Sequence, residues 1–189
     1  MMAHDGVTEL KDTTAFSGMG TDECTNAVFN SADCLSLREG LESVFSGIQF
    51  LRIPSGIYVK DIPGNIFLVR RGVNIELADG SMWIFFKFYK TTQHFASGRR
   101  GYIGYIYVDV NGEKTPNIIG RDIFQLNIAS NGDIIPYGSQ AWSEIKYGDP
   151  NTGYWRTGTS IYSNCATTGN NNTGEACAGR VLEEDAMNY

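Results

Sequence analysis

The residues whose types and spacing could do chemistry together in this sequence lie between positions 109 and 122. Asp109, Asn111 and Asp122 offer carboxylate and amide oxygens, which are the ligands that calcium prefers. The stretch departs from the EF-hand pattern, because Gly112 stands at the fourth place from Asp109 and Gly120 stands at the twelfth, where that motif has an acid. The same residue types also form Asx turns, so a structural link between two strands is the alternative, and the sequence favours it over a metal site.

Patterns that would predict an enzyme are missing from the sequence. It contains no G-x-S-x-G or H-E-x-x-H motif, and its only interior histidine, His94, lies in a polar segment. The glycines at 18 and 20 begin a dinucleotide fingerprint, but Glu23 stands where its last glycine belongs. The carboxylates at 183–185 are more typical of a solvated helix face than of an acid–base pair. We therefore expect no catalytic residues, and no cofactor unless calcium binds.

Four aromatic residues are candidates for a binding surface. They follow Tyr137 in a segment rich in Gly, Asn and Thr that we expect to be a long loop. Flat apolar rings with polar edges suit stacking on sugars. The alternative is that these rings cap the core or fill a contact between subunits, and the sequence favours this alternative. The four residues are Trp142, Tyr147, Tyr154 and Trp155.

The four cysteines form two local pairs, Cys24 with Cys34 and Cys165 with Cys177. No C-x-x-C spacing occurs and neither histidine lies near a cysteine, so a zinc site lacks its usual ligand pattern. An even number of cysteines in local pairs predicts two short disulfide loops and an oxidising compartment outside the cytoplasm. Four buried, reduced thiols are the alternative.

Composition predicts one folded domain. Of the 189 residues, 42% are hydrophobic and 19% are charged, which is typical of a packed globular chain. The net charge is −6 and the basic residues form no broad cluster, so we expect no nucleic-acid partner. No export signal or membrane-spanning run occurs in the sequence. Its polar start at Met1 is what removal of an N-terminal targeting or anchoring segment would leave.

Two helices are expected. From Leu35, apolar residues recur at helical spacing, with Asp33 or Ser36 as the expected N-cap and an end near Gly47. The apolar side of this helix is expected to face the core. A second, terminal helix is expected over residues 175–187.

Between the helices the hydrophobic period changes to two, which predicts an antiparallel meander. Asp79-Gly80 lies between two such segments and is the residue pair that a two-residue primed turn requires. Asn131-Gly132 predicts another hairpin in the same way. The expected strands cover residues 57–60, 66–70, 73–78, 81–90, 102–110, 123–129 and 133–136.

Several short motifs follow one another in the C-terminal two-thirds of the chain. They are Leu77-Ala-Asp-Gly80, Tyr107-Val-Asp-Val-Asn-Gly112, Pro116-Asn117, Gly120, Asp122 and Phe124, Gly132 to Pro136, and Cys165 with Ala176-Cys177-Ala178, before a terminal Met187-Asn188-Tyr189. In this order they resemble the globular domains of bacterial type IV pilin-like proteins, which are made as prepilins with an N-terminal segment that is cleaved and methylated. The most specific piece runs from Asp-Val-Asn-Gly to Gly-x-Asp-x-Phe.

The resemblance implies a single pilin-like domain over residues 1–189 with an α+β fold. An N-terminal helix would pack on an antiparallel β-sheet, and a disulfide between Cys165 and Cys177 would staple the C-terminal loop. An apolar helix that precedes this domain would anchor the subunit in the inner membrane and later pack in the core of a filament.

The function implied is that of a non-catalytic structural subunit of a type IV pilus or of a type II secretion pseudopilus. Its partners would be other pilin subunits, together with the prepilin peptidase and the assembly machinery, and its final location the extracellular surface. The alternative, which rests on the four loop aromatics, is an extracellular adhesin module that binds carbohydrate or another surface.

Overall fold

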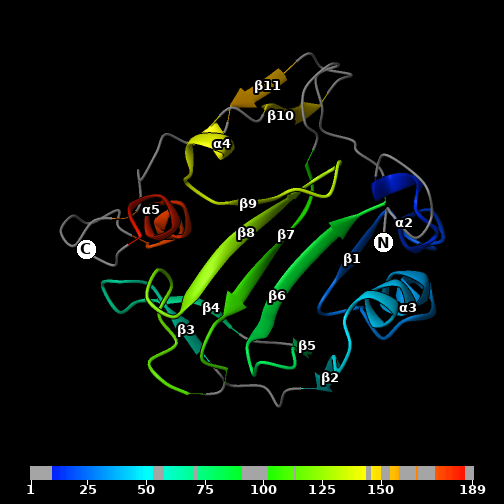
Figure 1. Ribbon diagram of the computed structural model, residues 1–189, viewed down its shortest axis with the longest axis horizontal. Coiled ribbons are helices and arrows are strands. Elements are labelled where there is room, and N and C mark those ends of the chain that lie inside the picture. The colour runs from blue at the N-terminus through cyan, green and yellow to red at the C-terminus, as the bar shows by residue number, and fades with distance from the viewer. Residues whose placement is uncertain are drawn as a thin grey trace.

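The computed structural model describes residues 10–52, 58–69, 72–90, 102–112, 114–143, 146–149, 154–157, 165 and 173–185. Short helices lie near both ends of the chain, and a run of β-strands occupies its middle (Figure 1). In chain order they are η1 (Leu10–Asp12), α2 (Thr14–Ser17), β1 (Glu23–Thr25), η2 (Ala32–Cys34), α3 (Leu35–Val44), β2 (Gln49–Arg52), β3 (Tyr58–Lys60), β4 (Ile66–Val69), β5 (Val73–Glu76), β6 (Met82–Tyr89), β7 (Tyr102–Asp109), β8 (Ile123–Ala129), β9 (Ile134–Pro136), α4 (Gln140–Ser143), β10 (Lys146–Asp149), β11 (Tyr154–Thr157) and α5 (Cys177–Glu184).

A seven-stranded antiparallel sheet dominates the described part of the chain. Its strand order is β2-β5-β6-β7-β8-β9, and β1 also pairs with β6. β5 pairs with the beginning of β6, at Met82 and Trp83, whereas β1 pairs with its end, from Lys87 to Tyr89. Two short strands therefore share one side of β6. The β3–β4 and β10–β11 hairpins form separate two-stranded sheets.

The two faces of the sheet belong to two apolar clusters, because side chains alternate between faces along a strand. On one face, Phe86 and Phe88 of β6 pack with Phe16 of α2 and with Leu37 and Leu41 of α3. Phe16 and Phe88 meet edge to face, with 6.0 Å between ring centroids. Burying a side chain of this kind contributes about 1.5–3 kcal/mol to stability, so this cluster attaches the helices to the sheet.

On the opposite face the β3–β4 hairpin is part of the cover. Val59 of β3 is fully buried with Ile84 of β6 and Ile123 of β8, and Phe67 of β4 packs against this cluster. The loop before β8 also reaches β3, since the Lys60 amide donates to the Asn117 carbonyl at 3.0 Å.

The first expected helix exists, but neither expected residue caps it. Cys34 occupies the N-cap position and makes no side-chain capping bond, while the Ser36 hydroxyl donates to the Ala15 carbonyl at 2.9 Å. The expected cap is wrong because the 3₁₀ turn η2 leads directly into α3 and leaves no extended residue before it. Phe45, which has an extended backbone, ends the helix two residues before Gly47.

Both expected hairpins exist, but their turns have three residues. At the first, the Gly80 amide donates to the Leu77 carbonyl and the Leu77 amide donates to the Ser81 carbonyl, both at 2.9 Å. Gly80 has φ 84°, which is the left-handed residue that follows a type I turn in this kind of loop. The pattern repeats at Gly132, between β8 and β9. The expected two-residue primed turn is therefore wrong, since Asp-Gly suits either geometry.

The expected cysteine pairs are both disulfides. Cys24–Cys34 joins β1 to η2, and Cys165–Cys177 joins residue 165 to the first residue of α5. All four cysteines are buried, and none is free. Four reduced thiols, the alternative, are thereby excluded.

The α+β class, the antiparallel sheet and the disulfides confirm the coarser part of the expected fold. The sheet predominates and the helices are short, and α3 comes after α2 and β1, so it is not the N-terminal helix that we expected. The terminal helix is shorter than expected, and β10 and β11 occupy part of the expected long loop. None of the helices in the described ranges is long and apolar enough to cross a membrane.

Candidate functional site

One face of strands β7 and β8 is apolar and only partly covered. Ile106 pairs with Leu126 and Val108 pairs with Phe124, and the side chains of residues paired in this way lie on the same face of an antiparallel sheet. In Figure 1, β6, β7 and β8 lie between α3 and α5. Leu126 and Val108 are only partly buried, although they pack against the cluster that contains α3.

Two cavities lie along this face. The first, of 410 Å³, lies beside α3, and the second, of 270 Å³, lies beside α5, where all of its described lining residues are apolar. The two cavities are lined by neighbouring residues of one face, since Ile106 and Ile128 line the first and Val108 and Leu126 line the second, so the cavities are adjacent along β7 and β8. We call this surface the apolar trough. Its walls are Leu41 and Val44 of α3 with Phe45 directly after it, and Ala178, Val181 and Leu182 of α5.

The rim of the apolar trough carries exposed apolar side chains. Leu182 is 65% exposed, Ile134 of β9 is 59% exposed and Val110 after β7 is 54% exposed. Single exposed apolar residues are normal on a protein surface, but several around one apolar hollow mark a site for another apolar surface.

The chain meets the apolar trough at Leu10. The Leu10 amide donates to the Ser130 carbonyl at 2.6 Å, and its side chain lines the cavity beside α3 together with Asn131 and Gly132. Leu10, the first described residue, therefore lies at the end of the trough formed by the β8–β9 turn.

The loop from β7 to β8 brings together the three residues expected to bind a metal. Asp122 accepts hydrogen bonds from the Ile118 amide at 2.6 Å and the Asn117 amide at 2.7 Å. The side-chain amide of Asn111 lies 3.3 Å from the same carboxylate, and the Asn111 backbone amide donates to Asp109 at 3.2 Å. Asp122 thus organises the backbone of the loop. In the parts of the chain that the structure describes, no three His, Cys, Asp or Glu side chains are grouped as a metal site.

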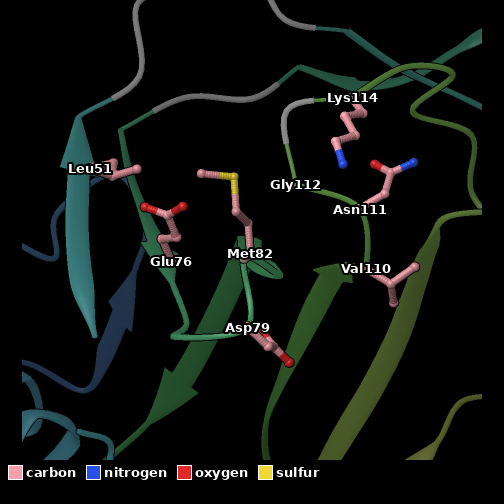
Figure 2. A pocket seen from close by; sticks show the side chains of 9 residues that line it. Leu51, Glu76, Asp79, Met82, Val110, Asn111, Gly112 and Lys114 are labelled. Atoms are coloured by element: carbon pink, nitrogen blue, oxygen red, sulfur yellow. The ribbon is translucent and has the colours of Figure 1, made fainter. Parts of the chain in front are cut away.

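A hollow of 530 Å³ lies at the end of the sheet beside this loop (Figure 2). Glu76 extends into it from β5, Lys114 extends into it from the other side, and Met82 lies between them (Figure 2). Asp79 belongs to the neighbouring turn, where the Ser81 hydroxyl donates to its carboxylate at 2.7 Å and lowers its pKa. The hollow can hold a polar group, and its described lining offers two acids, Glu76 and Asp79, and the amine of Lys114 rather than a nucleophile with its base.

The expected aromatic platform does not form as a set of four. Trp142 is 5% exposed and packs with Ala129 and Ile135, with its ring 5.5 Å from that of Tyr137. It therefore has the core position that was the alternative. The other three share the β10–β11 hairpin, where Asp149 pairs with Tyr154, and their side chains lie outside the described residues.

The remaining candidates for chemistry are placed as follows. His94 lies outside the described residues. Glu184 pairs with Arg180 on α5 at 3.0 Å, and Glu183 accepts a hydrogen bond from the Gln140 amide at 2.8 Å. Both acids are exposed, as expected for a solvated helix face.

A buried polar cluster joins the sheet to the segment before α5, and the sequence did not predict it. The Tyr107 hydroxyl lies 2.9 Å from Gln125 Oε1 and 3.2 Å from Glu175 Oε1, and it can donate its single proton to one of them at a time. Burial raises the pKa of this hydroxyl, and the Glu175 carboxylate raises it further. The contact fixes the segment before α5 against β7. Because its partners are far apart in sequence, no local pattern predicts it.

The fold and the apolar trough together define an α+β protein with an incompletely covered sheet face. Comparison with protein-family models, with curated proteins and with solved structures finds no match.

Proposed function

We propose that this chain is the globular part of a filament subunit of the type IV pilin-like class, in a type IV pilus or a type II secretion pseudopilus, and that it is not an enzyme. The observation that carries the proposal is the apolar trough. A helix of this same subunit, N-terminal to Leu10, would fill it and would complete the helix-on-sheet arrangement that the sequence resemblance implies.

The dimensions of the apolar trough suit such a helix. Strands lie about 4.8 Å apart and a helix with its side chains is about 10 Å across, so one helix covers roughly two strands. The floor of the trough is β7 and β8. A seven-residue strand such as β8 is about 24 Å long, which about 16 helical residues match.

The position of Leu10 supports the choice of occupant. Because Leu10 is bonded to the β8–β9 turn, a helix that precedes residue 1 and is joined to Leu10 through the polar residues 1–9 would enter the trough from that end. In the proposed filament subunit, the same helix would extend beyond the domain. It would lie in the inner membrane before assembly and in the filament core, among other subunits, after assembly.

The two disulfides fit an extracellular location. Disulfides persist in oxidising compartments, and both of these are buried and close short loops. Prepilin peptidase and the assembly machinery are the partners that processing and export of such a subunit would need.

The trough is tested with variants on its rim in the protein expressed from its own gene in the native cell. We expect Ile134→Asp and Leu182→Asp to abolish surface filaments seen by electron microscopy, because a buried carboxylate would oppose helix packing. Ile66→Asp is the matched control, since Ile66 is equally exposed at 61% but lies on β4, outside the trough. The three isolated domains should melt at the same temperature as the parent.

Filaments of normal abundance with both rim variants would contradict the proposal. A first check is the gene upstream of the codon for residue 1, where we expect a cleavage site followed by about 20 apolar residues. An ordinary signal peptide there would instead favour the adhesin alternative, whose remaining candidates are Tyr147, Tyr154 and Trp155.

A further inference from the structure

The loop between β7 and β8 holds buried oxygen atoms that no described donor satisfies. Asn111 Oδ1 and Asn117 Oδ1 are both enclosed, and neither has a hydrogen-bond partner among the residues that the structure describes. Asn117 as a whole is only 7% exposed. Buried polar atoms in native proteins are almost always paired, so two unpaired acceptors in one loop call for a donor or a cation.

The Asn111 side chain and the Asn117 backbone lie beside buried carboxylates. Asp109 is 0% exposed and Asp122 is 5% exposed. The Asn117 amide donates to Asp122 at 2.7 Å, and Asn111 contacts both acids, Asp109 at 3.2 Å and Asp122 at 3.3 Å. Two carboxylates and two amide groups are therefore adjacent.

The charge of Asp122 is balanced by no described basic side chain. Its partners are amides, from Ile118, Asn117 and Asn111, and the described ion pairs lie elsewhere. Burying an anion without a cation is unfavourable, and a bound metal ion is one way in which proteins compensate for it. The unpaired oxygens of Asn111 and Asn117 are hydrogen-bond acceptors, so a cation can coordinate them.

We propose that Asp109, Asn111, Asn117 and Asp122 bind one Ca²⁺ ion. Ca²⁺ takes six to eight oxygens in irregular sets of carboxylates, amide oxygens, backbone carbonyls and water, whereas Mg²⁺ requires nearly octahedral geometry. The Asp122 carboxylate can accept its hydrogen bonds and still coordinate a cation, because its two oxygens offer about four lone-pair sites. If the Asn111 side-chain amide is flipped, Oδ1 takes the position that Nδ2 has beside Asp122, where it could coordinate the same ion.

The ion would fix the whole end of the sheet. Val110 on the rim of the apolar trough and Asn111 at the hollow of Figure 2 both belong to this loop. The site does not depend on the proposed filament function, because its four residues do not take part in the helix contact.

The site is tested on the protein treated with EDTA and then titrated with CaCl₂ by calorimetry, with thermal melting in parallel. We expect one site with a Kd of about 10⁻⁴ to 10⁻³ M, the range of extracellular calcium modules, and a rise in melting temperature. NaCl at equal ionic strength is the control for screening, and it should not reproduce that rise.

Asn111→Asp separates a cation site from a structural turn. A third carboxylate should lower the melting temperature in EDTA, because like charges repel, but should tighten Ca²⁺ binding about tenfold. Asn131→Asp is the matched control. Asn131 forms a similar turn with Asp133, at 3.1 Å, and its substitution should leave Ca²⁺ affinity unchanged.

Asn111→Ala, at a partly exposed position that tolerates truncation, should weaken Ca²⁺ binding about tenfold by removing one ligand. The proposal is overturned if CaCl₂ produces no saturable heat, or no more stabilisation than NaCl. It is also overturned if Asn111→Asp lowers the melting temperature equally in EDTA and in calcium.

Discussion

Asp122 shows how a single side chain can replace backbone pairing. Its carboxylate binds the amides of Asn117 and Ile118 and the side chain of Asn111, in a loop that runs outside the sheet between β7 and β8. Hydrogen bonds to an ionised acceptor are stronger than neutral ones, so one acid can hold several backbone groups of an irregular segment. Tyr107 of β7 has a comparable role, because its hydroxyl contacts Glu175 and holds the segment before α5.

At the residue scale, Tyr107→Phe should reduce the free energy of unfolding by about 1–2 kcal/mol. The change removes a buried hydroxyl and leaves Gln125 and Glu175 without its proton. Urea denaturation measures the effect. Tyr58→Phe is the matched control, because Tyr58 is 51% exposed and its substitution should change stability by less than about 0.5 kcal/mol. Equal effects of the two substitutions would show that the Tyr107 contact contributes nothing.

At the scale of elements, α5 is positioned by close backbone contact. The Gly179 amide donates to the Tyr137 carbonyl at 2.9 Å, and a Cβ on Gly179 would stand 2.2 Å from the Ser139 nitrogen. Only glycine allows α5 to approach the turn after β9 so closely. Because α5 is one wall of the apolar trough, the width of the trough depends on this contact.

We expect Gly179→Ala to destabilise the protein by about 2 kcal/mol through overpacking and to loosen α5 from the sheet. Hydrogen exchange would show faster exchange across residues 177–184. Gly64→Ala is the control, since a Cβ there meets no atom within 4 Å and only its φ of 96° is strained. If α5 exchanges no faster in Gly179→Ala than in Gly64→Ala, the close contact does not position the helix.

The boundaries of the helices and strands show which features a local sequence pattern can predict and which it cannot. The strand over 123–129 is found at the expected residues, because alternation of apolar side chains is a local property. The N-cap of α3 and the three-residue turn at Gly80 differ from expectation, because competing local geometries suit the same residue types. The β10–β11 hairpin occupies polar sequence in which no apolar alternation marks a strand.

At the scale of the whole molecule, the two disulfides link the helical segments to the rest of the chain. Cys24–Cys34 holds the start of α3 near β1, and Cys165–Cys177 holds the start of α5. The two walls of the apolar trough are thus each attached covalently at one end. This arrangement would preserve the trough outside a cell, where no chaperone restores an opened domain.

Intact mass measured with and without reductant should differ by two hydrogens for each disulfide. Closing loops of this size stabilises a protein by about 3 kcal/mol each, so reduction should also lower the melting temperature clearly. Separate Cys24→Ser/Cys34→Ser and Cys165→Ser/Cys177→Ser variants assign the effect to each loop. An unchanged mass would remove the argument for an oxidising compartment.

The sequence by itself determined the α+β class, the central strands, the first helix and the cysteine pairs, because each rests on periodicity or spacing within a short segment. It also singled out Asp109, Asn111 and Asp122 as one group. Only the tertiary structure decided that Trp142 is buried and that Tyr107 meets Glu175. It alone also revealed the apolar trough, since that surface joins α3, β7, β8 and α5. Burial is a property of how distant segments pack, and no local pattern contains that information.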